Sequence, residues 1–202
     1  MQIVEIVFHI ATSGPTMLPV DHSHALYGAI KNAVPAFATC DHLGIHVMRG
    51  TASGDGQILL DSKDARLRMR MPTEFIPQAL QLAGRALRVY GSRFCVGTAS
   101  VALLQPAPTL WARMVTRKFD GHDKQLAEVS LQKDILEAYP NAAFTIKRAR
   151  TIRIHQKQIL GFEVLADNLT PEDSVQLQSF GFGGRRAFGC GIFVSLGATN
   201  GN

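Results

Sequence analysis

A glycine-rich, cationic loop near the end of the chain carries the strongest chemical signal in the sequence. Five of the 18 glycines lie between residues 181 and 191, around the adjacent pair Arg185 and Arg186. Glycine lets the backbone adopt positive φ and approach a partner closely, and arginine supplies planar, permanently charged donors. The segment FGFGGRRAFGCGIF therefore predicts a binding loop for an anionic group.

Two common nucleotide-binding motifs do not explain this loop. A dinucleotide fingerprint needs its glycines between a strand and a helix, with a third glycine where Arg186 stands, whereas the predicted order here is helix, loop, strand. A P-loop fails because Gly189 is followed by Cys190 and Gly191, not by Lys and Ser or Thr. An enzyme that binds a small phosphate ligand in some other way stays open as an alternative, and it predicts little salt dependence.

A second cationic feature precedes the loop, in the segment IKRARTIRIHQK. No acidic residue occurs between residues 138 and 162, so a merely solvated charged face is disfavoured. The excess of 21 basic over 16 acidic residues, a net charge of +5, also favours a polyanionic partner. We expect phosphates to follow a track of five cations on one strand pair: Lys147, Arg148, Arg150, Arg153 and Lys157.

Four histidines group around one predicted helix and the loop after it: His22, His24, His42 and His46. Imidazole has an unperturbed pKa of about 6.5, so it suits proton transfer near neutral pH. On the helix, His22 shares a stripe with Leu26 and is expected to pack, while His24 points elsewhere. The group lacks convincing thiol or carboxylate partners, so we predict no metal site.

The order of predicted elements repeats once along the chain. The first half is predicted to contain a strand at 2–10, a helix at 21–34, strands at 44–50 and 65–71, a helix at 73–83 and a strand at 85–90. The second half, after the prolines of QPAPT, is predicted to contain a strand at 110–116, a helix at 123–139, strands at 143–154 and 158–167, a helix at 170–180 and a strand at 191–196. The predicted fold class is α+β, with tandem ferredoxin-like (RRM-like) βαββαβ domains at 1–104 and 110–202.

Three details of this pattern are specific enough to test. Asp21 is predicted to cap the first helix, and Thr170, followed by Pro171, the last one. In the helix at 123–139 the residues predicted to face inward are Leu126, Val129, Ile135 and Leu136.

The sequence favours a cytoplasmic protein that does not enter a membrane. Glu5 interrupts the apolar N-terminal run, which has no basic lead, so a signal peptide is not expected. The uncharged stretch 94–112 contains Pro106 and Pro108 and does not suit a bilayer. Three cysteines without a CxxC motif indicate reduced thiols.

The glycine loop resembles the signature of the CRISPR-associated RAMP superfamily: glycine, apolar residue, glycine, five residues including a cation, then glycine, any residue, glycine. Gly181, Phe182 and Gly183, the run GRRAF, and then Gly189, Cys190 and Gly191 fill this pattern. The loop also lies where the family has it, between the last helix and the last strand. The segments DHSHALYGAI, GIHVMRG and PAPTLWARMVT look like the compact subgroup of the Cas-six repeat-RNA endoribonucleases.

That resemblance implies an endoribonuclease without metal or other cofactor. Such an enzyme cuts CRISPR repeat RNA in the precursor transcript through attack of a ribose 2′-hydroxyl, leaving a 2′,3′-cyclic phosphate and a 5′-hydroxyl. It stays bound to the 3′ hairpin of the product, and its expected partners are guide RNA and other subunits of an effector complex. The alternative is a RAMP subunit that scaffolds guide RNA without cleaving it.

The resemblance also implies where the functional residues lie. The family usually keeps its catalytic histidine around the first helix and the loop that follows it, at a position that differs between subgroups. His42 is the first choice as general acid or base, because the polar loop FATCDHLG can place its imidazole beside a scissile phosphate. His24 and His46 are the alternatives, beside a weakly catalytic site that uses no histidine. The resemblance places Arg185 and Arg186 against RNA, and the backbone at Gly183 and Gly189 is expected to approach it closely.

Overall fold

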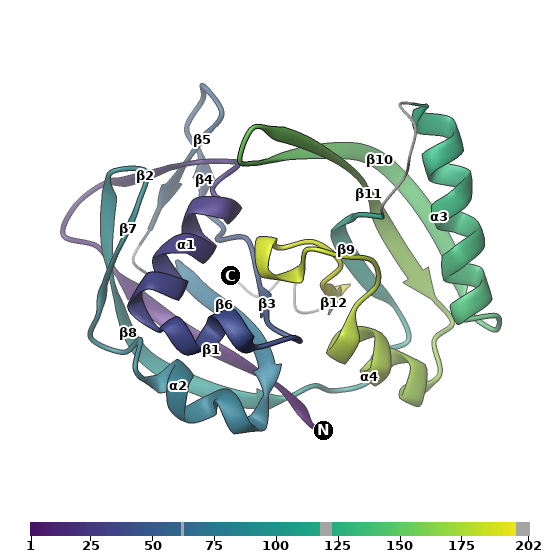
Figure 1. The fold of residues 1–202 in the computed structure, drawn as a ribbon, viewed down its shortest axis with the longest axis horizontal. Helices are drawn as coiled ribbons and strands as arrows, with labels where there is room; N and C mark the ends of the chain where they lie inside the picture. The colour runs from purple at the N-terminus through teal and green to yellow at the C-terminus, as the bar shows by residue number, and fades with distance from the viewer. Residues whose placement is uncertain (62, 118–122, 197–202) are drawn as a thin grey trace. The chain divides into compact units, whose positions relative to one another are not determined.

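The chain divides into two compact units, unit 1 at Met1–Leu103 and unit 2 at Leu104–Asn202 (Figure 1). The structure, a computed structural model, describes residues 1–61, 63–117 and 123–196. The division falls one residue before the segment QPAPT. Each unit has a hydrophobic core of its own and is described separately below.

Unit 1 contains a five-stranded sheet in the order β3-β6-β1-β8-β7 and a smaller sheet in the order β2-β5-β4. Its strands are β1 (Ile3–Ala11), β2 (Thr16–Pro19), β3 (Gly44–Ile45), β4 (Thr51–Ala52), β5 (Gln57–Leu60), β6 (Arg66–Pro72), β7 (Ala86–Val89) and β8 (Ser92–Leu103). Its helices are α1 (Ser23–Ala33), α2 (Ile76–Leu80) and the 3-10 turns η1 (Pro35–Thr39) and η2 (Thr73–Phe75).

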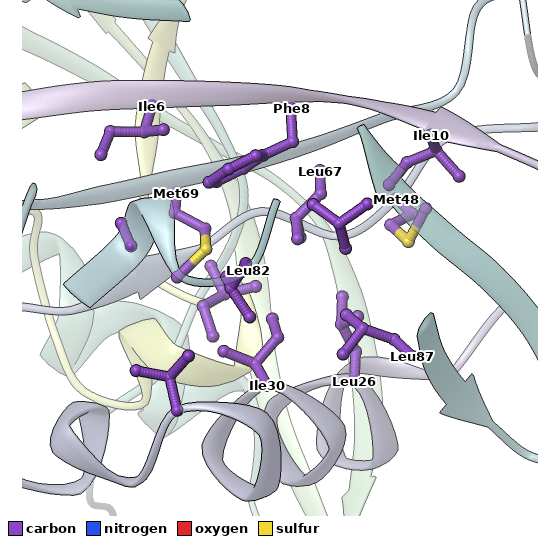
Figure 2. Close-up of a cluster of buried hydrophobic side chains, with 14 of the residues drawn as sticks. Ile6, Phe8, Ile10, Leu26, Ile30, Met48, Leu67, Met69, Leu82 and Leu87 are labelled. Atoms are coloured by element: carbon purple, nitrogen blue, oxygen red, sulfur yellow. The ribbon is translucent and has the colours of Figure 1, made fainter. Parts of the chain in front are cut away.

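The core of unit 1 lies between one face of the larger sheet and its helices. Alternation along β1 turns Ile6, Phe8 and Ile10 to this face, where all three are buried. Leu26 and Ile30 of α1 point toward them across the core (Figure 2). The intervening residues of β1, among them Glu5, therefore lie on the opposite side of the sheet, called here the second face.

Unit 2 contains a four-stranded antiparallel sheet in the order β10-β11-β9-β12. Its strands are β9 (Leu110–Val115), β10 (Ala143–Ile154), β11 (Lys157–Asp167) and β12 (Phe193–Ser195). Its helices are α3 (Lys124–Ala138), α4 (Pro171–Phe180) and the 3-10 turn η3 (Arg186–Phe188). Leu131 and Ile135 of α3 and Leu177 of α4 pack on one face of this sheet and form the core of unit 2.

Both units confirm the predicted tandem ferredoxin-like fold. In unit 1 the strands β3, β6, β1 and β8 stand in the order second, third, first, fourth, and in unit 2 β10, β11, β9 and β12 stand in the same order. The predicted cap of α4 is also confirmed, because the side chain of Thr170 accepts a hydrogen bond from the backbone N–H of Asp173 at 3.1 Å.

Four local predictions for unit 1 are wrong. The segment 85–90, predicted as the fourth strand of the βαββαβ unit, forms the edge strand β7, and the fourth strand of the ferredoxin-like order is β8, which lies beside β1 on the side away from β6. The predicted strand 44–50 shortens to β3, and the predicted helix 73–83 shortens to η2 and α2. The N-cap of α1 is His22 in place of Asp21. Gly97, Ala99 and Ala102 of β8 have weak strand propensity, so pairing with β1 decides the structure of this segment.

The inward face predicted for α3 is also wrong in part. Ile135 is buried, but Leu126 and Val129 are exposed and Leu136 is at the edge of exposure. The buried positions are Ala127, Leu131 and Ile135, which recur every four residues and so share one face of the helix. The apolar residues of α3 lie on more than one side, so periodicity alone did not select the packed side.

Candidate functional site

The basic strand pair predicted from sequence is the long antiparallel hairpin β10–β11 of unit 2 (Figure 1). Lys147, Arg148, Arg153 and Lys157 are exposed on it, and Arg150 is half-buried. The register shifts between Ile146 and Ala149, so both Lys147 and Arg148 lie opposite Glu163 on the partner strand. Such a β-bulge brings two cations to a place where a regular strand would present one.

An acidic residue from the neighbouring strand enters this cationic track. Glu163 Oε2 accepts hydrogen bonds from Arg148 Nε at 2.8 Å and from Arg150 Nη2 at 3.2 Å, while Trp111 Nε1 donates to Oε1 at 3.0 Å. Burial alone raises the pKa of Glu163, but these three hydrogen bonds outweigh it and lower the pKa. Two of the five predicted RNA-binding cations are therefore oriented by a carboxylate.

The glycine loop is fastened to the end of β9. The N–H of Gly184 donates to the carbonyl oxygen of Thr116 at 3.1 Å, and the N–H of Gly191 donates to that of Met114 at 2.7 Å. A Cβ on Gly183 would collide with the Thr116 carbonyl oxygen. Gly183 and Gly189 both have positive φ, at 77° and 79°. The close backbone approach that sequence assigned to a ligand is, at Gly183, an approach to this chain's own strand.

The two loop arginines have different surroundings. Arg185 is exposed and adopts a left-handed backbone conformation with φ of 63°. Arg186 begins η3 and is half-buried, and its guanidinium nitrogens are shielded from solvent. Of the pair, Arg185 is therefore the cation presented at the surface.

A small apolar cluster joins the loop to the hairpin. Cys190 of the loop packs with Ile152 of β10 and Met114 of β9, and Phe188 packs against the same cluster. The hairpin positions Ile154 and Ile159 complete it. Arg185 and the basic hairpin therefore belong to one packed part of unit 2.

His46 lies in an ion cluster on the second face of the unit 1 sheet. Its Nε2 is 3.2 Å from Glu5 Oε1, and Glu5 also accepts hydrogen bonds from Arg68 and Arg70. Burial lowers the pKa of His46 to about 4. The charges of Arg70 and Arg68 also lower this pKa, and the contact with Glu5, which raises it, does not outweigh them. His46 is therefore neutral at pH 7, which disfavours it as a general acid.

His24 lies in α1, and His42 lies nine residues beyond its last residue. His24 occupies the first turn, and His42 lies in the turn between η1 and β3. After β3 the chain reaches Met48, whose N–H donates to His22 Nε2 at 3.1 Å, back at the start of α1. The 11 residues of α1 span about 16 Å. His42 therefore lies on the segment that leads from the end of α1 back to its start.

His22, by contrast, is a buried structural residue. Its Nδ1 lies 2.7 Å from the carbonyl oxygen of Pro19, and its Nε2 accepts the Met48 N–H. Both ring nitrogens therefore contact the backbone, as expected for a histidine that packs rather than reacts.

The described part of the chain supports neither a metal site nor a membrane-spanning helix. Within residues 1–61, 63–117 and 123–196, no group of three His, Cys, Asp or Glu side chains is placed to hold a metal ion. Over the same residues, every helix is too short or too polar to cross a bilayer.

Comparison with known proteins decides the family. The sequence model of the Cas6 CRISPR family matches residues 4–197. A curated CRISPR-associated endonuclease Cas6 of Myxococcus xanthus is 32% identical over 198 residues, which covers 98% of this chain and 83% of that protein. The chain belongs to the Cas6 family.

Solved structures of Cas6-related proteins share the fold. A structure of the product of a Cas6-related gene from Pyrococcus furiosus has a TM-score of 0.69 at 14% identity, covering 95% of this chain and 98% of that one. Thermus thermophilus Cse3, bound to an RNA representing a pre-cleavage complex, has a TM-score of 0.54 at 11% identity, covering 96% and 98%. At these identities the likeness concerns the tandem fold of the Cas6 chain.

Sequence reasoning missed the two glutamates that organise the charges of this Cas6 protein. Glu163 is the first acid after the basic run, and Glu5 interrupts the apolar pattern of the first strand. The signal for Glu163 was present, because pairing 143–154 with 158–167 as a hairpin brings this acid back beside the cations. Glu5 and Arg70 are direct neighbours across the β1–β6 pair, which only the register reveals.

Proposed function

We infer that this Cas6 protein is an endoribonuclease that cuts the repeat in a CRISPR precursor transcript to release guide RNA. The observation that carries this function is the match to a curated Cas6 endonuclease over 98% of this chain and 83% of that protein. The exposed cations of the β10–β11 hairpin supply a surface suited to the RNA backbone. The protein is assigned to the cytoplasm, and its further partners are other subunits of a guide-RNA effector complex.

The reaction is an internal transesterification of RNA. The 2′-oxygen at the cleavage site attacks the adjacent phosphorus, the bond from phosphorus to the 5′-oxygen breaks, and the products are a 2′,3′-cyclic phosphate and a 5′-hydroxyl. One proton leaves the 2′-hydroxyl and one reaches the 5′-oxygen, so the step needs neither water nor a metal ion. His42 is assigned one of these two proton transfers, because an imidazole accepts or donates a proton near neutral pH.

Binding and charge neutralisation are assigned to unit 2. Phosphates are contacted by four exposed cations: Lys147, Arg153, Lys157 and Arg185. Arg148 and Arg150, which are hydrogen-bonded to the carboxylate of Glu163, also contact phosphates. After cleavage the protein stays on the 3′ hairpin of the repeat, because these backbone contacts are unchanged by the reaction.

The test uses repeat RNA in two forms, with an unmodified cleavage site and with 2′-deoxyribose at the nucleotide that supplies the attacking hydroxyl. We expect the unmodified RNA to be cut in excess EDTA and the deoxy RNA to be bound but left intact. A requirement for magnesium, or cleavage of the deoxy RNA, contradicts the mechanism. Binding of unmodified RNA without any cleavage identifies the non-cleaving RAMP subunit instead.

A further inference from the structure

Glu163 is an acid at the centre of a surface that must bind a polyanion. It lies on β11 between Phe162 and Val164, which face the core, so its side chain is on the face of the unit 2 sheet that lies away from the core. The side chain is only 11% exposed, yet its pKa is lowered and the carboxylate is charged at neutral pH. By Coulomb's law alone this charge weakens RNA binding, because it repels phosphate and cancels part of the attraction of its neighbours.

The contacts of Glu163 show what the acid does in return. Arg148 donates through Nε, at 2.8 Å, while its side chain stays 71% exposed. Because the guanidinium is planar, a hydrogen bond at Nε orients the whole group and leaves the Nη end for a second partner. Arg150 donates to the same carboxylate oxygen and is largely covered.

Trp111 fixes the other side of the carboxylate. Its indole N–H donates to Oε1 at 3.0 Å, so the two oxygens of Glu163 serve different partners. The carboxylate is thus held in place from β9 and in turn holds two arginines of β10. A side chain that is already immobilised loses less conformational entropy when it binds, and this saving strengthens binding.

The Glu5 cluster of unit 1 shows the same pairing with a different outcome. Glu5 binds Arg68 and Arg70, but the side chain of Arg70 is only 2% exposed and three quarters of that of Arg68 is covered. Those arginines are mostly covered by the protein itself, and the cluster joins β1 to β6. In unit 2 the equivalent carboxylate leaves Arg148 at the surface.

We propose that Glu163 is a positioning residue for RNA binding, which holds Arg148, and through the same oxygen Arg150, in a fixed orientation toward the phosphates of the repeat. The proposal rests on the proposed function in one respect, that the β10–β11 hairpin binds the RNA. It assigns a net gain in affinity to an acidic residue within the cationic track.

The test is the charge-removing substitution Glu163→Gln in the full-length protein. Affinity is measured on repeat RNA carrying the 2′-deoxy nucleotide, over a range of salt concentrations. If charge alone mattered, this variant would bind more tightly than the parent. We expect it to bind roughly three- to tenfold more weakly, the scale of one side chain that must be ordered on binding.

A matched control separates position from charge. Glu137→Gln makes the same change on the exposed surface of α3, which packs on the opposite face of the sheet. We expect this control to bind RNA as tightly as the parent or slightly more tightly. Equal effects of the two substitutions overturn the proposal, as does parent-like or tighter binding by Glu163→Gln.

A double-mutant cycle identifies the residue through which Glu163 acts. In the Arg148→Ala background we expect Glu163→Gln to weaken binding much less than it does in the parent, because the arginine it orients is gone. Fully additive effects overturn the proposal. A purely structural role for Glu163 would lower the melting temperature without this coupling in RNA affinity.

A further variant keeps the test decisive if Glu163→Gln does not fold. Arg148→Lys preserves the charge but removes the Nε donor and the planar group, so we expect weaker RNA binding, whereas a charge-only role predicts parent affinity. If the parent itself does not bind repeat RNA, the proposed function fails. If the parent binds and all these variants match it, only the role of Glu163 is wrong.

Discussion

At the scale of single residues, burial and neighbouring charges set the protonation of Glu5 and His46. Burial raises the pKa of Glu5, but His46, Arg70 and Arg68 outweigh it and hold the pKa well below its usual range. His46 is kept neutral beside this carboxylate, with a pKa of about 4. Folding therefore gives His46 a lower proton affinity than it has in the unfolded chain.

This difference predicts a loss of stability in mild acid. An unfolded histidine has a pKa of about 6.5, so between pH 6.5 and 4 the unfolded chain takes up a proton that folded His46 refuses, and the free energy of unfolding falls as pH falls. We expect this residue to account for about 2 kcal/mol of the loss by pH 4.5. The measurement is chemical denaturation of the parent and of His46→Gln at several pH values. Above pH 4.5, before Glu5 contributes, the variant should lose less stability, and parallel curves would contradict the assignment.

At the scale of elements, the glycine loop depends on its attachment to β9. Gly183 has a φ of 77° and no room for a Cβ beside the Thr116 carbonyl oxygen, whereas a Cβ on its neighbour Gly184 would meet open space. We expect Gly183→Ala to destabilise unit 2 by at least about 1 kcal/mol and to weaken RNA binding, because a left-handed conformation and a backbone collision both oppose it.

The adjacent substitution Gly184→Ala is the control, with an expected melting temperature and RNA affinity near those of the parent. Thermal melts of the free proteins and binding of repeat RNA provide both readouts. Equal stability of the two variants would show that the loop is not constrained by β9. If Gly183→Ala lost RNA affinity without losing stability, the close approach of the Gly183 backbone would instead be assigned to the RNA.

At the scale of the whole molecule, the proposal divides labour between the two units. We expect His42→Ala in unit 1 to lower the single-turnover cleavage rate by about 10² while leaving the affinity for repeat RNA nearly unchanged. We expect Arg153→Ala with Lys157→Ala in unit 2 to weaken binding and to reduce the salt dependence by up to about two phosphate contacts. At saturating protein this second variant should cleave at close to the parent rate. Parent-like cleavage by His42→Ala would transfer the catalytic assignment to His24.

The sequence by itself determined the features that depend on neighbours along the chain. The alternation of the first strand, the Thr170 cap and Pro171 at the start of the last helix all follow from local periodicity and local hydrogen bonding. The repeated order of elements and the spacing of the glycine motif were sufficient for the ferredoxin-like fold and the family.

Only the tertiary structure decided the features that depend on partners distant in sequence. β8 is a strand because it pairs with β1, and α3 buries Ala127 and Leu131 because that side meets the sheet. Glu163 reaches Arg148 across a hairpin whose register includes a bulge. Burial and cross-strand pairing are set by which segments pack together, and neither composition nor spacing along one strand contains that information.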